Sequence, residues 1–211
     1  MEKRQKKEEK QEELQSRYFM YAILFVVILI AVILSFRHMP TGMFSKEEKQ
    51  SYSYNGFVFT NITGLWFTEI QKAGTNKVFR VPLHYGPREL QNVTINGDVV
   101  PFQNLSELYI TFDPVGEDFS YIALAASELS INLAQTLGIT PIAACTKNET
   151  QICYDRPIID CESSGLPAIC LRHAEPAMVY VENNCIFVQG QERNLMKAAD
   201  RLLLKWFSVM Q

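Results

Sequence analysis

The sequence lacks the short motifs that usually mark an enzyme. It contains no G-x-S-x-G, H-E-x-x-H or S-x-x-K motif and no glycine-rich loop that would hold a phosphate. Histidine is scarce, with three residues in 211. Asp155 and Asp160 lie close in sequence, but a calcium loop needs a denser set of oxygen ligands. The sequence therefore predicts no catalytic residue, metal site or cofactor, and it argues against an enzyme.

The chain also lacks a basic excess after its first 40 residues. Residues 41–211 contain 13 Lys+Arg and 18 Asp+Glu. A domain that neutralises nucleic-acid phosphates needs a basic face. Nucleic acid is therefore excluded as an expected partner.

Charge is absent from one long apolar run, YFMYAILFVVILIAVILSF at residues 18–36. At roughly 1.5 Å per residue, a helix of this length reaches about 28 Å, close to the thickness of a bilayer's hydrocarbon core. The run has no polar stripe, which a surface helix would have. The following RHMPTGMF offers no small-residue cleavage site, so we predict an uncleaved signal-anchor that spans the lipid bilayer.

The orientation of the predicted span follows from the basic residues beside it. Those before the span are Lys3, Arg4, Lys6, Lys7, Lys10 and Arg17, and those after it are Arg37, Lys46 and Lys49. Because basic residues resist translocation, the N-terminus is expected in the cytoplasm. We predict a charged cytoplasmic tail at 1–17, a transmembrane helix at 18–36, a linker at 37–54 and an extracytoplasmic domain at 55–211, in a single-pass protein of the cell membrane.

Four of the five cysteines lie in one segment, residues 145–170. The five are Cys145, Cys153, Cys161, Cys170 and Cys185. None forms the closely spaced pair of a zinc site or the C-x-x-C of a redox site, and thiols outside the cytoplasm are normally oxidised. We therefore predict disulfides that hold a loop with little regular structure. The sequence does not select the connectivity, and the fifth cysteine is either buried in a strand or paired with another chain.

Four N-x-S/T sequons follow the predicted span and agree with an extracytoplasmic location. They begin at Asn61, Asn92, Asn104 and Asn148. Each is a candidate glycosylation site.

The first part of the domain reads as an antiparallel meander. Three β-rich runs, at about 56–61, 64–71 and 77–84, are separated by the turn sequences NITG and KAGTN. A strand at 108–114, a helix from Asp118 to about Leu137 and a strand at 139–145 then form a predicted βαβ unit with parallel neighbours. Gly138 is expected to end the helix.

The last part of the domain reads as a hairpin and a helix. AMVYVENNCIFVQG predicts two strands joined at Asn183-Asn184, since Asn tolerates positive φ. The final helix is expected over about 192–209. The predicted fold class is α+β: one mixed sheet, made of the antiparallel meander and the βαβ unit, with two covering helices.

The densest polar cluster in the domain is LHYGPREL, around a Gly-Pro turn. Its candidate binding residues are His84, Tyr85, Arg88 and Glu89, because Arg88 can bind an anion and His84 can donate a hydrogen bond. The alternative is a structural corner in which Arg88 and Glu89 are paired or solvated.

Two further positions have both a chemical and an ordinary interpretation. Cys170 and His173 could form a nucleophilic pair, but an exported cysteine in a Cys-rich loop is more often bridged. Asp113 ends a strand just before a helix, where α/β proteins place ligands. An Asp that caps the turn before Pro114 is the ordinary interpretation.

The runs FVFTNITGLWFTEI, VPLHYGPREL and CIFVQGQERNLMKAADRLLLKWF give the chain a resemblance to uncharacterised small single-pass membrane proteins of archaea. The shared features are the N-terminal anchor, the HYGPRE-like turn and the C-terminal A-A-D-R helix. The resemblance implies an archaeal envelope setting and carries no known activity. It draws attention to His84, Gly86, Pro87, Arg88 and Asp200.

Two functions follow as expectations. The first is a non-enzymatic envelope protein whose anchored domain binds a partner protein or a surface-layer component. The second is an anchored extracytoplasmic enzyme or small-ligand-binding domain that uses the turn at His84, Arg88 and Glu89.

Overall fold

The structure is a computed structural model that describes residues 20, 24–31, 50–72, 74–116 and 119–211. The chain divides into two compact units, Met1–Glu48 and Lys49–Gln211. In the first unit, residues 20 and 24–31 are helical with exposed side chains. Within the described residues, no helix combines the length and the apolar character that a membrane crossing requires. The predicted tail, most of the predicted span, residues 37–49 of the linker and Asp118 lie outside the described residues.

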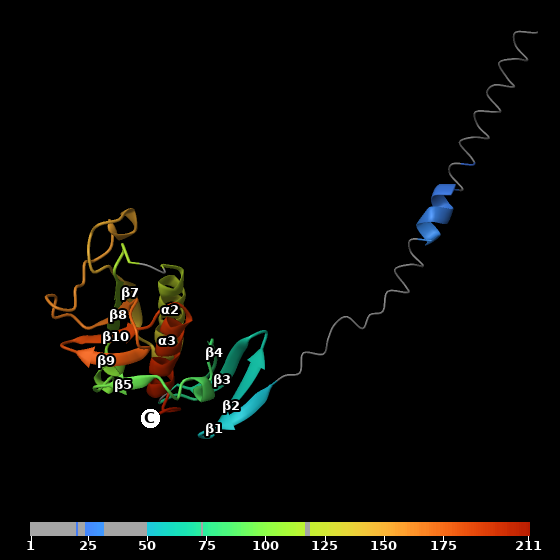
Figure 1. The fold of residues 1–211 in the computed structure, drawn as a ribbon. Helices are drawn as coiled ribbons and strands as arrows, with labels where there is room; N and C mark the ends of the chain where they lie inside the picture. Colours follow the sequence, from blue (N-terminus) through green and yellow to red (C-terminus); the bar gives the residue numbers. More distant parts are fainter. Residues whose placement is uncertain (1–19, 21–23, 32–49, 73, 117–118) are drawn as a thin grey trace, which may run out of the picture. The chain divides into compact units, whose positions relative to one another are not determined.

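The second unit contains two sheets rather than the single mixed sheet that the sequence suggested. The four-stranded sheet has the order β1-β2-β3-β4 and is antiparallel throughout. Its strands are β1 (Ser51–Tyr54), β2 (Phe57–Ile62), β3 (Leu65–Gln71) and β4 (Val78–Leu83). The predicted meander is therefore confirmed, and β1 adds a strand at the end of the predicted linker (Figure 1).

The second sheet has six strands in the order β5-β9-β10-β8-β6-β7. They are β5 (Thr94–Asn96), β6 (Glu107–Phe112), β7 (Thr140–Ala143), β8 (Ala168–Arg172), β9 (Met178–Glu182) and β10 (Cys185–Gln189). The pair β9-β10 is antiparallel and the other neighbours are parallel, so the sheet is mixed.

One edge strand of each sheet contains a proline. Pro82 is in β4 and Pro141 is in β7, and each of these strands ends its sheet. A proline lacks the backbone N–H that a second neighbouring strand would need, so it is confined to edges and bulges.

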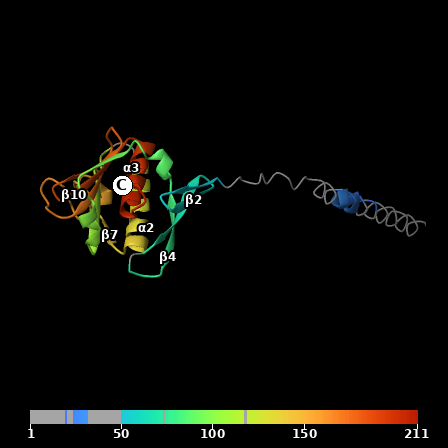
Figure 2. The same ribbon diagram turned by 90° about the horizontal axis from the view of Figure 1, so that it is seen from below.

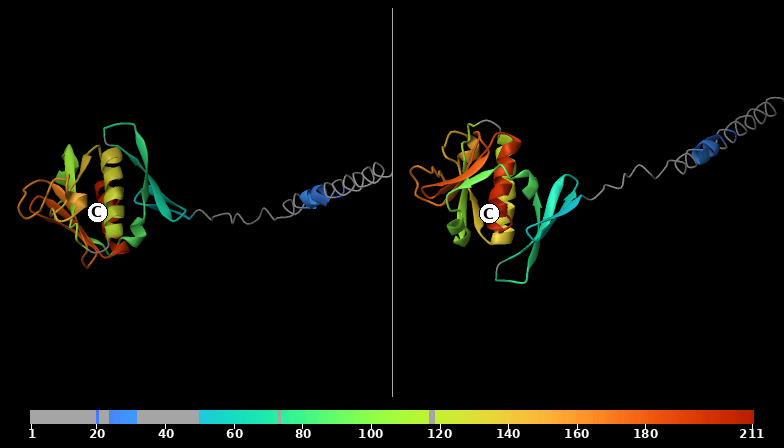
Figure 3. Two further views of the ribbon diagram at one scale, coloured as in Figure 1. Left: turned by 90° about the horizontal axis from the view of Figure 1, so that it is seen from above. Right: turned by 60° about the horizontal axis from the view of Figure 1, so that its bottom comes forward.

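Two helices lie between the sheets (Figures 2 and 3). α2 (Phe119–Asn132) continues as a π-helical turn (Leu133–Leu137) that ends at Gly138, where φ is +77°. The predicted βαβ unit is confirmed, because β6 and β7 flank α2 in sequence and pair in parallel. α3 (Arg193–Trp206) lies within the range expected for the final helix, and its buried residues include Leu195, Ala199, Leu202, Leu203 and Trp206. The core of this unit comprises the apolar faces of both helices and the facing strands.

The hairpin β9-β10 turns at Asn183, whose φ of +52° confirms the predicted turn. After β10, Gly190 lies directly against the backbone of Asn194, so that a Cβ at Gly190 would overlap main-chain atoms. This close approach lets α3 begin immediately after the sheet.

The cysteine-rich segment contains one strand that the sequence analysis missed. β8 lies in the middle of the six-stranded sheet, between β10 and β6, and four of its five residues are buried. Because a central parallel strand is covered on both faces, its sequence AICLR has no alternating pattern. The rest of the segment carries a short 3-10 turn (Gln151–Cys153) and otherwise no regular element.

The disulfides are Cys145–Cys153 and Cys161–Cys185, and Cys170 is a buried free thiol on β8. The prediction of disulfides in this segment is confirmed. Of the two expectations for the fifth cysteine, burial in a strand is the correct one.

Candidate functional site

The turn that follows β4 is held by its own glutamate. Residues Pro87–Glu89 form a 3-10 turn that starts after Gly86. Oε2 of Glu89 accepts hydrogen bonds from the Gly86 backbone N–H at 2.9 Å and from Nε1 of Trp66 at 2.8 Å. Glu89 is therefore engaged in building the corner, and these contacts favour the structural interpretation of this residue.

Arg88 lies on the outer side of the same turn. Its guanidinium carbon is 4.1 Å from the centre of the Tyr52 ring, a cation–π geometry. A cavity of about 260 Å³ adjoins this pair. It is lined by Gln50, Ser51, Tyr52, Trp66, Arg88 and Glu89.

His84 faces a different cavity. Its Nδ1 lies 2.6 Å from Oε2 of Glu128 on α2, and this hydrogen bond raises the pKa of His84. The cavity beside it, of about 130 Å³, is lined by Leu65, Pro82, His84, Leu124, Ser127, Glu128, Ile131 and Asn132. Because Arg88 and Glu89 line a separate cavity, the predicted binding residues of this turn do not converge on one ligand.

Asp200 on α3 completes a buried group around His84. The Asp200 side chain is fully buried, and its Oδ2 accepts the Tyr85 backbone N–H at 2.7 Å. One ligating atom from each of His84, Glu128 and Asp200 lies within 4.8 Å of the others, and we name these three residues the His84 cluster. Burial, together with the neighbouring Glu128 carboxylate, raises the pKa of Asp200 well above its ordinary range.

Sequence reasoning missed Glu128 and reached Asp200 only through the resemblance. A signal for both is present in the sequence. Glu128 stands beside Leu129 on the buried face of α2, and Asp200 follows Ala199 on the buried face of α3. An acidic residue on the apolar face of an amphipathic helix is costly unless it has a partner, which marks both positions as unusual.

A larger hollow lies where parallel strands end. β6, β7 and β8 run in the same direction, so Asp113, Thr146 and Arg172 meet at one edge of the sheet. We name this cavity, of about 500 Å³, the carboxyl-edge hollow. Its lining residues are Asp113, Gly116, Ile122, Thr146, Asp160, Cys161, Cys170, Leu171, Arg172, His173 and Ala174. The expectation that Asp113 stands at a ligand-binding edge thus has a cavity beside it.

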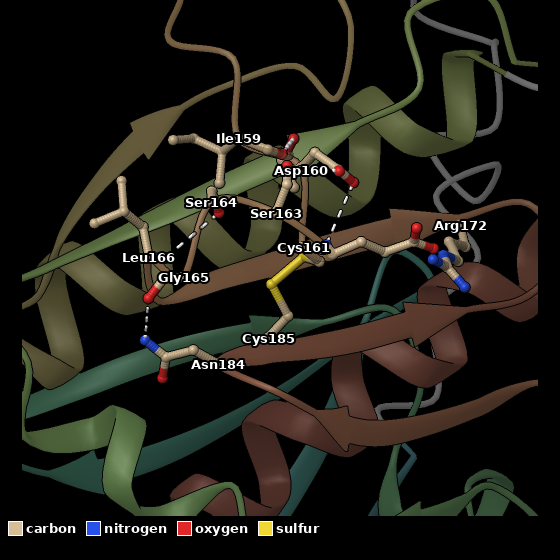
Figure 4. Close-up of a disulfide and its surroundings, with 12 residues drawn as sticks. Ile159, Asp160, Cys161, Ser163, Ser164, Gly165, Leu166, Arg172, Asn184 and Cys185 are labelled. Atoms are coloured by element: carbon tan, nitrogen blue, oxygen red, sulfur yellow. Dashed lines mark hydrogen bonds between the residues drawn. A yellow bond between two sulfur atoms is a disulfide. The ribbon is translucent and has the colours of Figure 1, made fainter.

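The Cys161–Cys185 bridge fixes one wall of the hollow. Cys161 is joined to the start of β10, and Figure 4 shows Asp160 next to the bridge and Arg172 farther along the sheet. Ser163 donates its hydroxyl to Oδ2 of Asp160 at 2.9 Å. Asp160 is therefore positioned by the disulfide-held segment.

The charged groups of the hollow include both signs. Arg172 donates from Nη1 to the Tyr180 hydroxyl at 3.0 Å, and its guanidinium carbon lies 4.1 Å from the centre of the Phe187 ring. Lys147 Nζ lies 3.3 Å from Oδ2 of Asp113, which lines the hollow. A polar ligand in the hollow can therefore meet both hydrogen-bond donors and acceptors.

Cys170 and His173 line the same hollow. Burial raises the pKa of the Cys170 thiol. Because the thiolate is the nucleophile, this environment opposes the activation that a catalytic cysteine needs.

Three of the four sequon asparagines are exposed, namely Asn92, Asn104 and Asn148. Asn61 is half-buried on β2, and its Oδ1 accepts the Gly64 backbone N–H at 3.2 Å. The exposed three are the more accessible candidates for glycosylation.

Comparison with protein-family models, with curated proteins and with solved structures finds no match to this chain.

Proposed function

We propose that this chain is a membrane-anchored envelope protein whose extracytoplasmic domain binds, without catalysis, a polar group of a partner protein or surface-layer component. The anchor is residues 18–36, with the N-terminus in the cytoplasm. The observation that carries the proposal is the carboxyl-edge hollow, about 500 Å³ in volume, with side chains of both charges at the ends of parallel strands.

The disulfides support a location outside the cytoplasm. Cys145–Cys153 and Cys161–Cys185 join residues that are buried in the folded domain. Structural disulfides form and persist in oxidising compartments and are rare in reducing ones. The exposed sequons and the uncharged run at 18–36 agree with this location.

The hollow supports binding because its polar groups are held in place before a ligand arrives. The Cys161–Cys185 bridge fixes the segment that carries Asp160, and Arg172 is held by contacts to Tyr180 and Phe187. Groups that are already ordered lose less conformational entropy on association. The oxidised domain thus presents a preorganised polar surface.

Binding is favoured over catalysis by the state of the nearest nucleophile. Cys170 is buried and its pKa is raised, so its thiol stays protonated. The Asp113 carboxylate is engaged by Lys147. The alternative site at His84, Arg88 and Glu89 has less support, because its side chains line two separate cavities.

Protease treatment of intact cells tests the location. The domain at residues 55–211 is expected to be digested from outside, while an epitope tag placed before Arg17 stays protected until the cells are permeabilised. If the tag were cleaved in intact cells while the domain stayed protected, the orientation would be the opposite of the one proposed.

Co-purification from native membranes tests the binding. We expect a partner to accompany the wild-type chain and to be lost from Arg172→Ala, which removes a cation from the hollow. Arg156→Ala is the matched control, because Arg156 is an exposed arginine of the same disulfide-held segment outside the hollow's lining. Equal recovery with both variants, each verified as folded, would contradict binding in the hollow.

A further inference from the structure

The His84 cluster brings together three side chains from three distant elements. His84 follows β4, Glu128 is on α2 and Asp200 is on α3. Glu128 is 8% exposed to solvent, and Asp200 is fully buried. Two buried carboxylates beside an imidazole form a costly arrangement that needs a compensating partner.

Each carboxylate uses one oxygen on a protein donor and leaves the other without one. Glu128 Oε2 contacts His84 Nδ1, and Asp200 Oδ2 accepts the Tyr85 backbone N–H. Glu128 Oε1 and Asp200 Oδ1 are buried and have no hydrogen-bond partner among the described residues. Buried carboxylate oxygens are normally satisfied, so these two atoms call either for a bound ligand or for a proton in a hydrogen bond between the Glu128 and Asp200 carboxyl groups, a contact that contributes to the raised pKa of Asp200.

We propose that the His84 cluster binds one divalent transition-metal cation, such as Zn²⁺ or Mn²⁺. One imidazole nitrogen with two carboxylates is a ligand set that these ions accept, whereas Mg²⁺ and Ca²⁺ prefer oxygen alone. A bound cation would also compensate the two buried negative charges.

The present geometry is close to that of a bound site. Two ligands at 2.0–2.2 Å from one ion in tetrahedral arrangement are on the order of 3.4 Å apart. The distance between His84 Nδ1 and Glu128 Oε2 is 2.6 Å, and one ligating atom from each of the three residues lies within 4.8 Å of the others. Metal binding therefore replaces the hydrogen bond between His84 and Glu128 and draws the more distant atoms inward.

Solvent can reach the cluster. The His84 side chain is 35% exposed, and the cavity of about 130 Å³ is lined by both His84 and Glu128. This cavity is the entry path for the ion. Three protein ligands leave at least one coordination position for water or a small ligand.

A bound ion would tie three parts of the domain together: the turn after β4, α2 and α3. Because such an ion binds the folded chain and finds no preformed site in the unfolded chain, it stabilises the fold by mass action. The proposal thus predicts a metal-dependent melting temperature.

A proton shared between Glu128 and Asp200 is the competing explanation for the cluster. The variant Glu128→Gln distinguishes the metal site from the shared proton. Its amide can donate a hydrogen bond to Asp200, but it cannot replace a carboxylate as a metal ligand. The variants Glu128→Gln, Asp200→Asn and His84→Gln each keep a polar side chain of similar size. Glu69→Gln, which removes an exposed carboxylate from β3, is the matched control.

The experiment uses the full chain, oxidised and in detergent, after treatment with EDTA. Co²⁺ is titrated and followed by its visible absorption, and melting is recorded with and without Zn²⁺. We expect one Co²⁺ per chain and a higher melting temperature with Zn²⁺ for the wild type and for Glu69→Gln. Affinity for Co²⁺ should fall by at least about tenfold in each of the three cluster variants.

Two results would overturn the proposal. The first is a wild-type chain that shows neither saturable Co²⁺ absorption nor a Zn²⁺-dependent melting temperature, which is the outcome for a shared proton. The second is Co²⁺ binding that is unchanged in Glu128→Gln and Asp200→Asn. Because the first result is read from the wild type alone, the test does not depend on the folding of any variant.

Discussion

Tyr85 donates its backbone N–H to Oδ2 of Asp200 at 2.7 Å, and this bond joins the turn after β4 to the middle of α3. The acceptor is fully buried, so water cannot replace it. The contact gives the Asp200 side chain a polar partner on the otherwise apolar face of α3.

Asp200→Ala is expected to lower the free energy of unfolding by about 2–3 kcal/mol, since the Tyr85 amide is left buried without an acceptor. Asp200→Asn should cost less than half as much, because its amide oxygen still accepts this bond. Urea unfolding in the presence of EDTA measures both values. Equal losses in the two variants would show that the hydrogen bond is not what Asp200 contributes.

Arg88→Ala is expected to reduce stability by no more than about 1 kcal/mol, because the cation–π contact with Tyr52 is on the surface. Partner recovery from native membranes should be unchanged. Thermal melting and co-purification check these outcomes, with Arg88→Lys as the control that keeps the cation. If Arg88→Ala abolished partner recovery while the domain stayed folded, the turn would be the binding site instead of the hollow.

Non-reducing mass spectrometry is expected to find Cys145–Cys153 and Cys161–Cys185. The bridges should differ in their contribution, because they join residues 8 and 24 positions apart. Loop-closure entropy gives about 2–3 kcal/mol for the shorter loop and roughly 1 kcal/mol more for the longer one.

Chemical denaturation of two paired variants checks this order. Replacing Cys161 and Cys185 by Ala should destabilise the domain more than replacing Cys145 and Cys153. The opposite order would mean that contacts within the shorter loop outweigh chain entropy.

Cys170 is expected to resist alkylation in the native protein and to react after denaturation. Burial raises its pKa, so the thiolate is scarcer at any given pH than for an ordinary cysteine. The raised pKa also makes the free energy of unfolding depend on pH. Below the pKa of the unfolded thiol, the stabilisation that comes from the protonated Cys170 thiol is fully present. It is lost as pH rises through the raised pKa of the folded state.

Alkylation kinetics at increasing pH measure this accessibility, with Cys170→Ala to identify the labelled site. Rapid labelling of native Cys170 at about pH 7 would contradict the raised pKa and reopen the nucleophilic interpretation.

Local signals predicted much of the fold. The turn sequences of the meander, the helix stop at Gly138 and the Asn183 turn each specify a structure within a few residues. The sequence lacks closely spaced cysteine pairs, and this absence correctly favoured disulfides over a zinc site. These features depend on neighbours along the chain, which a single sequence displays.

The remaining features depend on contacts between distant segments. β8 was missed because a strand buried on both faces has no alternating pattern. Glu128 and Asp200 meet His84 only when both helices pack against the four-stranded sheet. The local sequence of either helix does not predict this contact. Arg88 and His84 are close in sequence, yet the turn directs them to different cavities.

Site-specific photo-crosslinking in native cells tests most directly the claim that the hollow binds a partner. A photoreactive benzoyl-phenylalanine replaces Thr146 or Ala174, which line the hollow, or Glu107 or Thr140, which lie at the opposite, amino ends of β6 and β7. We predict one common product from the hollow positions, absent from the amino-end positions and lost when Arg172→Ala is added. Products of equal yield from both ends of the sheet, or products that survive Arg172→Ala, would contradict binding in the carboxyl-edge hollow.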